Sequence, residues 1–298
     1  MKQPPLIILG SPRSGTTFLG EVLSRHGDLA YAEEPRMIWR YGNDGRSDYL
    51  RAEDARPAVR ESIHRAFDRL VEEQGKKRLL EKTPSSGLRL PFIDAVYPDA
   101  QYVHVLRNGY DAALSIYSYS TNHSTGIPTN KLWQRLKELK PSQYPHYGKE
   151  FLARVMPRVF GRGNSRPVWG PRLPGMAGMA SELSALDIAC LQWRACTEAG
   201  CQSGRQLPAD RYMEIRLEDL DEAGLERIMA FANLPPDEAV LSHFRERFRP
   251  ADPEGRRDQA DPKQMARIKS WIEPTMLWLG YEDHAATTAK TAAMTGGE

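Results

Sequence analysis

The sequence has few cysteines and no long apolar run. Its three cysteines are Cys190, Cys196 and Cys201, whose spacing differs from the C-x2-C pattern of metal sites. So small and odd a number provides no disulfide framework, which is typical of a reducing compartment. No stretch reaches the ~18 apolar residues that span a bilayer. We therefore expect a cytoplasmic protein without a transmembrane segment, with its thiols buried or partly buried on one helix.

The charge is nearly balanced. Lys and Arg number 41 against 39 Asp and Glu, which gives a net charge of +2. This balance argues against a nucleic-acid partner and requires any anion site to be local. The 298 residues contain no internal repeat and no convincing linker. We expect a single domain over residues 1–283, with an insertion at about 120–180 and a disordered tail at 284–298.

The sequence does contain an anion-binding turn near its start. An apolar segment of strand length leads through a Gly/Ser-rich turn into an apolar-periodic segment that should be helical. Gly10 and Gly15 have the separation found in the phosphate loop of nucleotide triphosphatases, and Thr17 stands at its Ser/Thr position. Thr16 replaces the phosphate-binding lysine, which argues against hydrolysis of ATP or GTP. Arg13 supplies a cation inside the turn instead, so the segment predicts a site for a tetrahedral oxyanion.

Strands alternate with helices along most of the chain. The alternation predicts an α/β fold with a central parallel sheet, in which ligands bind beyond the carboxyl ends of the strands. The expected strands are 6–9, 29–32, 78–81, 102–106 and 212–215. The expected helices are 15–25, 57–74, 88–97, one from about 110, 181–203, 221–233, 237–248 and 262–280, the last interrupted at Pro274.

Four segments carry a recognisable set of motifs. They are Ser11–Thr17, Leu80–Pro84, Val105–Ser115 and Arg216–Leu220. In turn they resemble the 5′-phosphosulfate loop, the catalytic-lysine segment, the 3′-phosphate signature and a late strand-and-turn element of the sulfotransferases that use 3′-phosphoadenosine-5′-phosphosulfate (PAPS). The resemblance implies a P-loop-like three-layer fold with a helical insertion and a helical C-terminal part. It also implies transfer of a sulfonyl group to an acceptor hydroxyl, with 3′-phosphoadenosine-5′-phosphate (PAP) as product.

The resemblance implies a role for each matching residue. Lys82 would be catalytic, while Arg107 and Ser115 would hold the 3′-phosphate. The other cofactor contacts that it implies are Arg13, Ser14, Gly15, Thr16, Thr17, Arg256 and Arg257. Arg13 would also act in catalysis, by neutralising charge that develops on the sulfonyl oxygens. No metal is implied, because Lys82 and Arg13 would do what Mg²⁺ does in kinases.

The general base differs between branches of this family. The cytosolic small-molecule enzymes carry a histidine two residues after the lysine, where this chain has Pro84. The tyrosyl-protein branch uses a glutamate in a Glu-Glu-Thr-Arg stretch, which Glu33–Arg36 resembles. The resemblance therefore assigns Glu34 as the base, with His26 and His123 in reserve. Many bacterial members share this pattern, so it does not make the acceptor a tyrosine.

The chain departs from the family in two places. Leu217 stands where the cytosolic branch has a tyrosine near the adenine, and Glu254–Arg257 replaces its Arg-Lys-Gly loop. The insertion carries aromatic residues that could stack on a ring and five arginines that suggest either an anionic acceptor or a solvated basic face. These residues are Trp133, Tyr144, Tyr147, Trp169, Arg154, Arg158, Arg162, Arg166 and Arg172. We expect a glycan or glycolipid hydroxyl as acceptor, with a phenolic or alkyl alcohol as the alternative.

Two other classes of function stay open. A P-loop kinase or NTPase would use a lysine where Thr16 stands, and would have no use for the pair of Arg107 and Ser115. A nucleotide- or glycan-binding module without catalysis would not need a carboxylate base beside a cation. The apolar residues of the last helix are expected in the core, although they could also form the dimer face of a homo-oligomer: Ile268, Ile272, Met276 and Leu277.

Overall fold

The computed structural model describes residues 3–122, 138–149, 168–249, 257 and 260–281. Its centre is a sheet of five parallel strands in the order β2-β3-β1-β4-β5. The strands are β1 (Leu6–Gly10), β2 (Leu29–Glu33), β3 (Arg78–Lys82), β4 (Gln101–Leu106) and β5 (Tyr212–Arg216). The chain leaves β1 to one side and later returns to its other side, so the carboxyl end of β1 is a topological switch point, where α/β folds bind ligands.

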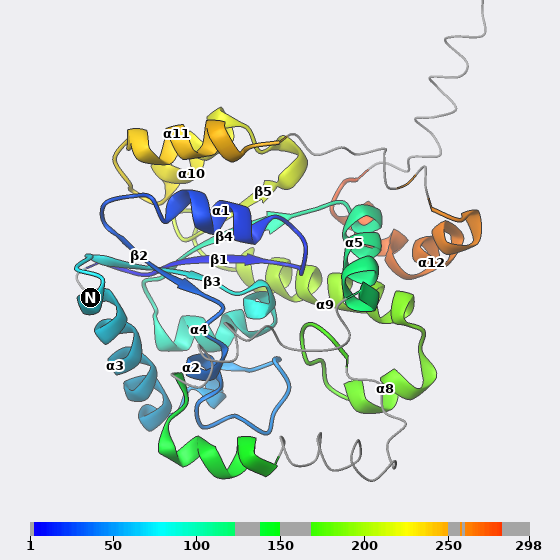
Figure 1. Ribbon diagram of the computed structural model, residues 1–298, viewed down its shortest axis with the longest axis horizontal. Coiled ribbons are helices and arrows are strands. Elements are labelled where there is room, and N and C mark those ends of the chain that lie inside the picture. The colour runs from blue at the N-terminus through cyan, green and yellow to red at the C-terminus, as the bar shows by residue number, and fades with distance from the viewer. Residues whose placement is uncertain (1–2, 123–137, 150–167, 250–256, 258–259, 282–298) are drawn as a thin grey trace, which may run out of the picture.

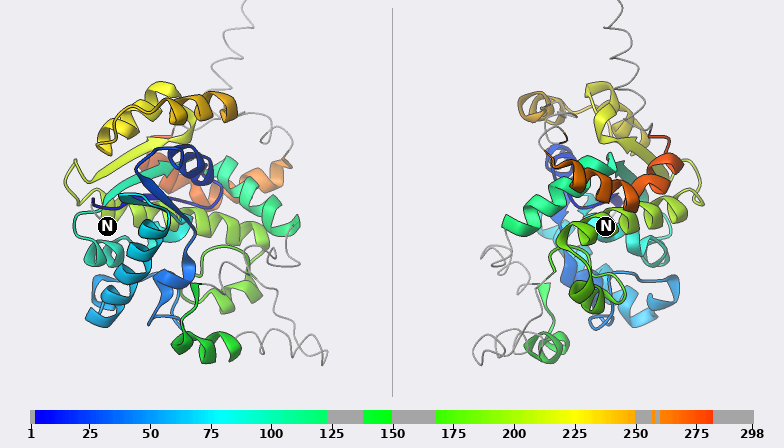
Figure 2. Two further views of the ribbon diagram at one scale, coloured as in Figure 1. Left: turned by 60° about the vertical axis from the view of Figure 1, so that its left-hand side comes forward. Right: turned by 90° about the vertical axis from the view of Figure 1, so that its right-hand side faces the viewer.

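Helices cover both faces of the sheet (Figure 1). Leu6 and Ile8 of β1 pack toward α1, α10 and α11, whereas Ile7 and Leu9 pack toward α2, α3 and α4. Figure 2 shows α10 and α11, in yellow and orange, on the opposite side of the sheet from α3. These helices are α1 (Thr16–Leu23), α2 (Arg36–Arg40), α3 (Pro57–Glu73), α4 (Leu90–Val96), α10 (Glu222–Phe231) and α11 (Glu238–Arg247). The predicted three-layer α/β fold is confirmed.

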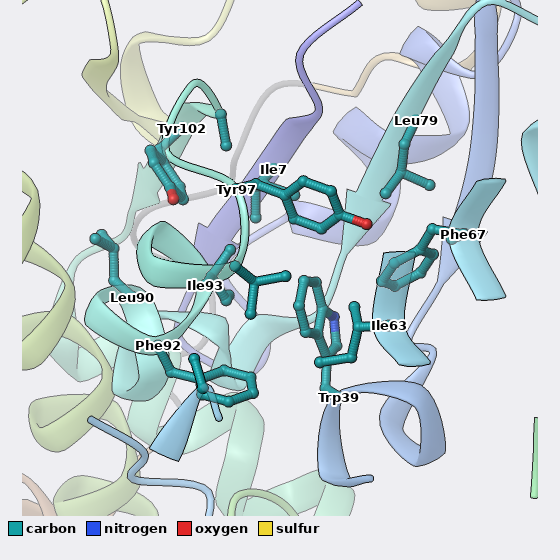
Figure 3. Close-up of a cluster of buried hydrophobic side chains, with 14 of the residues drawn as sticks. Ile7, Trp39, Ile63, Phe67, Leu79, Leu90, Phe92, Ile93, Tyr97 and Tyr102 are labelled. Atoms are coloured by element: carbon teal, nitrogen blue, oxygen red, sulfur yellow. The ribbon is translucent and has the colours of Figure 1, made fainter. Parts of the chain in front are cut away.

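Trp39 of α2 lies at the centre of the core on the α3 side of the sheet (Figure 3). Its ring centroid is 5.0 Å from that of Phe67 and 6.4 Å from that of Tyr97. Phe67 and Ile63 are four residues apart, so both project from the same face of α3 toward Trp39. The buried aromatic cluster therefore fixes α2 against the sheet directly after the turn that contains Glu34.

A second group of helices consists of α5 (Gly109–Asn122), α8 (Met176–Glu182), α9 (Ala185–Gly204) and α12 (Pro262–Trp278). Helix α9 packs on β1 and β4, on the same face of the sheet as α4. Ile268, Ile272 and Met276 are buried against α5 and α9, whereas Leu277 is 60% exposed. The core assignment is thus confirmed for three of these four residues. The three cysteines are all buried and free, as expected.

Several boundaries differ from the predicted ones. The expected helix 181–203 divides at Ser184, whose side chain caps α9 by accepting a hydrogen bond from the Asp187 N–H. The start of the expected helix 88–97 belongs to the 3₁₀ helix η2 (Pro84–Arg89). The predicted interruption at Pro274 is wrong, because α12 continues through it and Met276, beyond the proline, packs into the core. Three other short 3₁₀ helices are η1 (Ala52–Asp54), η3 (Pro141–Gln143) and η4 (Leu217–Asp219).

Candidate active site

The turn after β1 is tightly wound. The Ser14 N–H and hydroxyl both donate to the Ser11 carbonyl, at 3.3 and 2.8 Å. A Cβ on Gly10 would lie 2.4 Å from Ser14 Oγ, so only glycine fits there. Arg13 has a φ of 65° and Gly15 a φ of 85°, both in the left-handed region. The turn therefore curls back on itself at the carboxyl edge of the sheet.

Helix α1 begins at this turn without a capping side chain. Gly15 stands at the N-cap position of α1. Because glycine has no side chain, no side-chain hydrogen bond caps the first turn. The first N–H groups of a helix have no intrahelical partner, and the helix dipole adds positive potential there. Thr16 and Thr17 lie in this first turn and line the adjoining pocket. The local structure is therefore suited to bind an anion, as the sequence predicts.

A pocket of about 320 Å³ adjoins the turn. Its walls come from the turn after β1, the segments after β2, β3 and β4, and residues near 170. The predicted site residues among them are Arg13, Gly15, Thr16, Thr17, Glu34 and Arg107. The carboxyl edge of the sheet thus brings together groups that are about 90 residues apart in the chain, as the parallel arrangement predicts.

Lys82 lies directly behind this pocket and is fully buried. Its Nζ donates to Thr17 Oγ1 at 3.0 Å, and it lies 3.4 Å from Glu33 Oε1 and 3.4 Å from Glu34 Oε1. The buried ammonium is therefore compensated by two carboxylates and one hydroxyl. The arrangement puts a carboxylate, a cation and the start of α1 within contact of one another.

The backbone holds Glu34 in an unusual conformation. Its backbone φ is 50°, in a region that residues other than glycine rarely adopt. The Glu34 N–H donates to the Lys82 carbonyl at 2.8 Å, and Arg36 Nη2 donates to Glu34 Oε2 at 2.8 Å. Positive φ at a residue that is held from both its backbone and its side chain is typical of functional positions.

Arg13, Arg107 and Ser115 form a second group at the other end of the turn. Arg13 Nε donates to Ser115 Oγ at 3.2 Å, and the Arg13 guanidinium stacks on the Tyr119 ring at 5.1 Å. Arg107 Nη1 donates to the Arg13 carbonyl at 2.6 Å. The Arg13 side chain therefore points toward Ser115, whereas the catalytic role that the resemblance implies would place it at the sulfonyl oxygens. Tyr119 also packs on Trp169, with ring centroids 4.7 Å apart.

Some predicted residues lie elsewhere. Ser14 is fully buried and its hydroxyl closes the turn, so its side chain does not line the pocket. Arg257 pairs with Asp111 at the start of α5, with Nε 2.8 Å from Oδ1. His26 lies just before β2, at the opposite edge of the sheet, beside the Pro235 carbonyl. Some predicted residues fall outside the described parts of the chain: Arg256, His123, Trp133, Arg154, Arg158, Arg162 and Arg166. The predicted tail at 284–298 also falls outside them.

The structure adds two residues to which the sequence analysis gave no role. Arg36 and Ser85 both line the pocket; Arg36 comes two residues after Glu34, and Ser85 three residues after Lys82. Ser85 accepts a hydrogen bond from the fully buried Arg89, at 3.0 Å from Nη2. The signal in the sequence that could have identified Arg36 and Ser85 is their position close to two predicted catalytic residues.

Glu81 precedes Lys82 and points to the other face of the sheet, where it is fully buried. Thr83 Oγ1 donates to Glu81 Oε1, but burial still raises the pKa of Glu81 to about 7. The carboxyl group is therefore partly protonated near neutral pH.

One group in the described part of the chain has the composition of a metal site. The nearest ligand atoms of His104, Cys201 and Glu214 lie within 4.8 Å of one another. However, the Tyr212 hydroxyl lies between His104 Nδ1, at 2.7 Å, and Glu214 Oε1, at 2.9 Å. Arg205 also pairs with Glu214, so the group is a hydrogen-bond network away from the pocket, in which His104 Nε2 alone is buried without a partner among the described residues.

Comparisons with known proteins show the family to which the chain belongs. A model of the sulfotransferase family matches residues 4–157, which include the turn, Glu34, Lys82 and Arg107. The chain belongs to the sulfotransferase family. The nodulation protein NoeE of Sinorhizobium fredii is 32% identical over 132 residues, which are 38% of this chain and 32% of NoeE. The sulfotransferase chain thus spans about a third of that relative's length.

Solved sulfotransferase domains share the fold. The domain from the curacin biosynthetic pathway is 15% identical and superposes with a TM-score of 0.52, covering 94% of this chain and 98% of that one. The domain from the Synechococcus PCC 7002 olefin synthase is 18% identical, with a TM-score of 0.51 over 91% of this chain and 95% of that one. None of the helices that can be described in this sulfotransferase has the length and apolar character to cross a membrane.

Proposed function

We propose that this chain transfers a sulfonyl group from PAPS to an acceptor hydroxyl, with Glu34 as general base. The observation that carries the proposal is the contact of the buried Lys82 ammonium with both Glu34 and Thr17, at the mouth of the anion-binding turn. A carboxylate that can take a proton thus lies beside a cation that can stabilise a leaving oxygen.

The residues present fit PAPS at both of its anionic ends. The uncapped start of α1, with Thr16 and Thr17, suits the 5′-phosphosulfate. Arg13, Arg107 and Ser115 are joined by hydrogen bonds and suit the 3′-phosphate. Since Arg13 already points toward Ser115, we assign it to binding of the 3′-phosphate rather than to the sulfonyl group. Arg257 stays in the proposal as a more distant contact of the cofactor. Its ion pair with Asp111 holds it against α5.

When bound, PAPS supplies an activated sulfonyl group. Glu34 accepts the proton of the acceptor hydroxyl while that oxygen bonds to sulfur, and the bond from sulfur to the phosphate oxygen breaks. Lys82 neutralises the negative charge that develops on the departing phosphate. The fixed backbone of Glu34 and its bond to Arg36 keep the carboxylate oriented for this transfer.

The acceptor would enter beside Glu34. We propose a glycan or glycolipid hydroxyl, since Tyr119 and Trp169 line the pocket and aromatic rings stack well on sugars. A phenolic or alkyl alcohol is the alternative acceptor. Tyr147 is less suited to direct contact, because its hydroxyl donates to Asp44 at 3.0 Å.

The rival functions receive less support. A kinase or NTPase would need a lysine at Thr16, whereas Lys82, the lysine that donates to Thr17, comes from β3. A binding module would have no need for Glu34 to be held against Lys82. Incubation with [35S]PAPS and a panel of glycans, phenols and alkyl alcohols separates these functions. Transfer of label to at least one hydroxyl supports the proposal, and PAP binding without transfer to any acceptor favours the binding module.

A further inference from the structure

A single buried carboxylate, Asp48, is surrounded by three guanidinium groups. Its Oδ1 lies 2.8 Å from Arg40, 3.3 Å from Arg89 and 3.9 Å from Arg172. Burial alone would raise the pKa of Asp48, but Arg89 and Arg40 outweigh it and hold that pKa well below its usual range. The group therefore carries three positive charges against one negative charge.

Ser85 connects this group to the pocket. Arg89 is 1% exposed, and its Nη2 donates to Ser85 Oγ at 3.0 Å. Because that oxygen accepts a bond from the guanidinium, the Ser85 proton is available to an acceptor on another side. Ser85 lines the pocket, as does Pro171, the residue before Arg172. The positive group thus lies directly behind this wall.

Two arginines here have buried nitrogens without a hydrogen-bond partner in the described structure. They are Nε of Arg36 and both Nε and Nη1 of Arg89. Buried donors are satisfied in the great majority of cases. Because Arg36 lines the pocket, its unpartnered Nε points to an acceptor outside the described residues, whereas Arg89 does not line the pocket and its two nitrogens carry no such inference. Arg36 lines the pocket with Glu34, which it contacts through Nη2.

Glu34 offsets the charge of Arg36, whereas Asp48 is the carboxylate that pairs with Arg40, Arg89 and Arg172. Burial lowers the pKa of Arg89, and the guanidiniums of Arg40 and Arg36 lower it further, against the opposing effect of Asp48 and Glu81. Glu81 is itself partly protonated at neutral pH, since burial raises its pKa to about 7. The positive potential at this wall is therefore available to a ligand.

We propose that the wall formed by Arg36 and Ser85 binds an oxyanion carried by the acceptor, a carboxylate, phosphate or sulfate group next to the hydroxyl that is sulfonated. Arg36 and Ser85 are the direct donors, and Arg89 is a positioning residue that orients Ser85. The anions of the donor are served elsewhere, by the start of α1 and by Arg107. The inference rests on the proposed function and adds a substrate class to it, acceptors that are already acidic.

The test uses full-length protein saturated with PAP, so that the donor site cannot capture the probes. Calorimetry compares methyl glucoside with its 6-phosphate, its 6-sulfate and methyl glucuronide, which share one ring and differ in the oxyanion. We expect at least one acidic probe to bind about ten- to a hundredfold more tightly than methyl glucoside, the usual range for a hydrogen bond to a charged group. The preferred probe identifies the kind of oxyanion.

Variants locate the effect. Arg36→Gln and Ser85→Ala should each reduce that preference several-fold or more, with PAP affinity unchanged. Arg65→Gln and Ser181→Ala, at exposed positions on α3 and α8, are matched controls that should keep it. Ser85→Ala removes only one oxygen, so the test does not depend on a fold-sensitive substitution of Arg89.

Two results would overturn the inference: equal binding of acidic and neutral probes to the wild type, or a preference that survives both variants. The second result would also appear if Arg36 merely orients Glu34, in which case Arg36→Gln would lower kcat alone. The probes are titrated without PAP as well. A protein that fails to bind PAP counts against the proposed function, while loss of the probe preference in Arg36→Gln and Ser85→Ala, and not in the two controls, still decides the acceptor site.

Discussion

At the scale of single residues, two adjacent glutamates contact the same lysine but have different surroundings. Glu33 is 38% exposed and is the last residue of β2, whereas Glu34 is 17% exposed, has a positive φ and pairs with Arg36. Only Glu34 lines the pocket. The difference in backbone and partners, rather than the distance to Lys82, distinguishes the proposed base from its neighbour.

Glu34→Gln should lower kcat by roughly 10²–10⁴, because the amide keeps the shape of the side chain but cannot accept the proton. PAP affinity should change little. The measurement is turnover of [35S]PAPS with a saturating acceptor, alongside calorimetry with PAP. Glu33→Gln is the matched comparison and should cost less than tenfold. Equal losses in the two variants would contradict the assignment of the base.

At the scale of elements, the join between the turn and α1 depends on Gly15. Its φ of 85° is unfavourable for other residues, and an added Cβ would lie 2.5 Å from Leu217 Cδ1. Leu217 begins η4, directly after β5. A residue that departs from the pattern of the cytosolic branch therefore packs against the proposed donor loop.

Gly15→Ala should destabilise the protein by about 1–3 kcal/mol and weaken PAP binding, because the turn must move to relieve both the backbone strain and the contact. Adding Leu217→Ala should recover only the part that is due to the contact. Urea unfolding and PAP titration measure the two effects. Gly178→Ala, where nothing lies within 4 Å of the new Cβ, is the control and should be stable. Full recovery in the double variant would show that backbone strain contributes nothing.

The sequence predicted those helices, strands and turns whose signals lie in neighbouring residues. The strands and the turn were found because apolar runs, glycine spacing and helix periodicity are written in neighbouring residues. Lys82 and Glu34 could be placed at one sheet edge because parallel strands share a carboxyl edge. The predicted helix 181–203 failed at the cap formed by Ser184 and Asp187, a local signal that was overlooked.

Contacts between distant residues could not be predicted in this way. The pairing of Asp48 with Arg89 and Arg172 joins two loops and η2, and no spacing in the sequence marks it. The direction of Arg13 toward Ser115 depends on the positive φ at Arg13, which the residue type does not indicate. Side-chain direction in the site therefore required the structure.

At the scale of the whole molecule, the described residues share one continuous sheet, and we propose that they form a single domain. Glu81 lies in the interior of this domain, and its burial raises its pKa from 4.5 to about 7. The folded state holds this proton more tightly than the unfolded state. Stability therefore falls as the pH rises from about 4.5 to about 7, and the loss is complete above that range.

Glu81→Gln should remove this dependence, because glutamine has no proton to lose. The free energy of unfolding of the variant minus that of the wild type should increase between pH 4.5 and 7, and then level off. Urea unfolding at pH 5, 6, 7 and 8 measures it, with the exposed Glu226→Gln of α10 as control. A constant difference across this range would mean that Glu81 is ionised throughout.

The most direct test of the account is a calorimetric titration with PAP, in the presence and absence of Mg²⁺, on the wild type and on Arg107→Ala. We predict metal-independent binding of PAP that weakens about ten- to a hundredfold in the variant, because Arg107 is lost from the group proposed to hold the 3′-phosphate. Adenosine 5′-phosphate, which lacks that phosphate, should bind both proteins equally. Preference for ATP with Mg²⁺, or binding of neither nucleotide, would contradict the assignment of this pocket as a PAPS site.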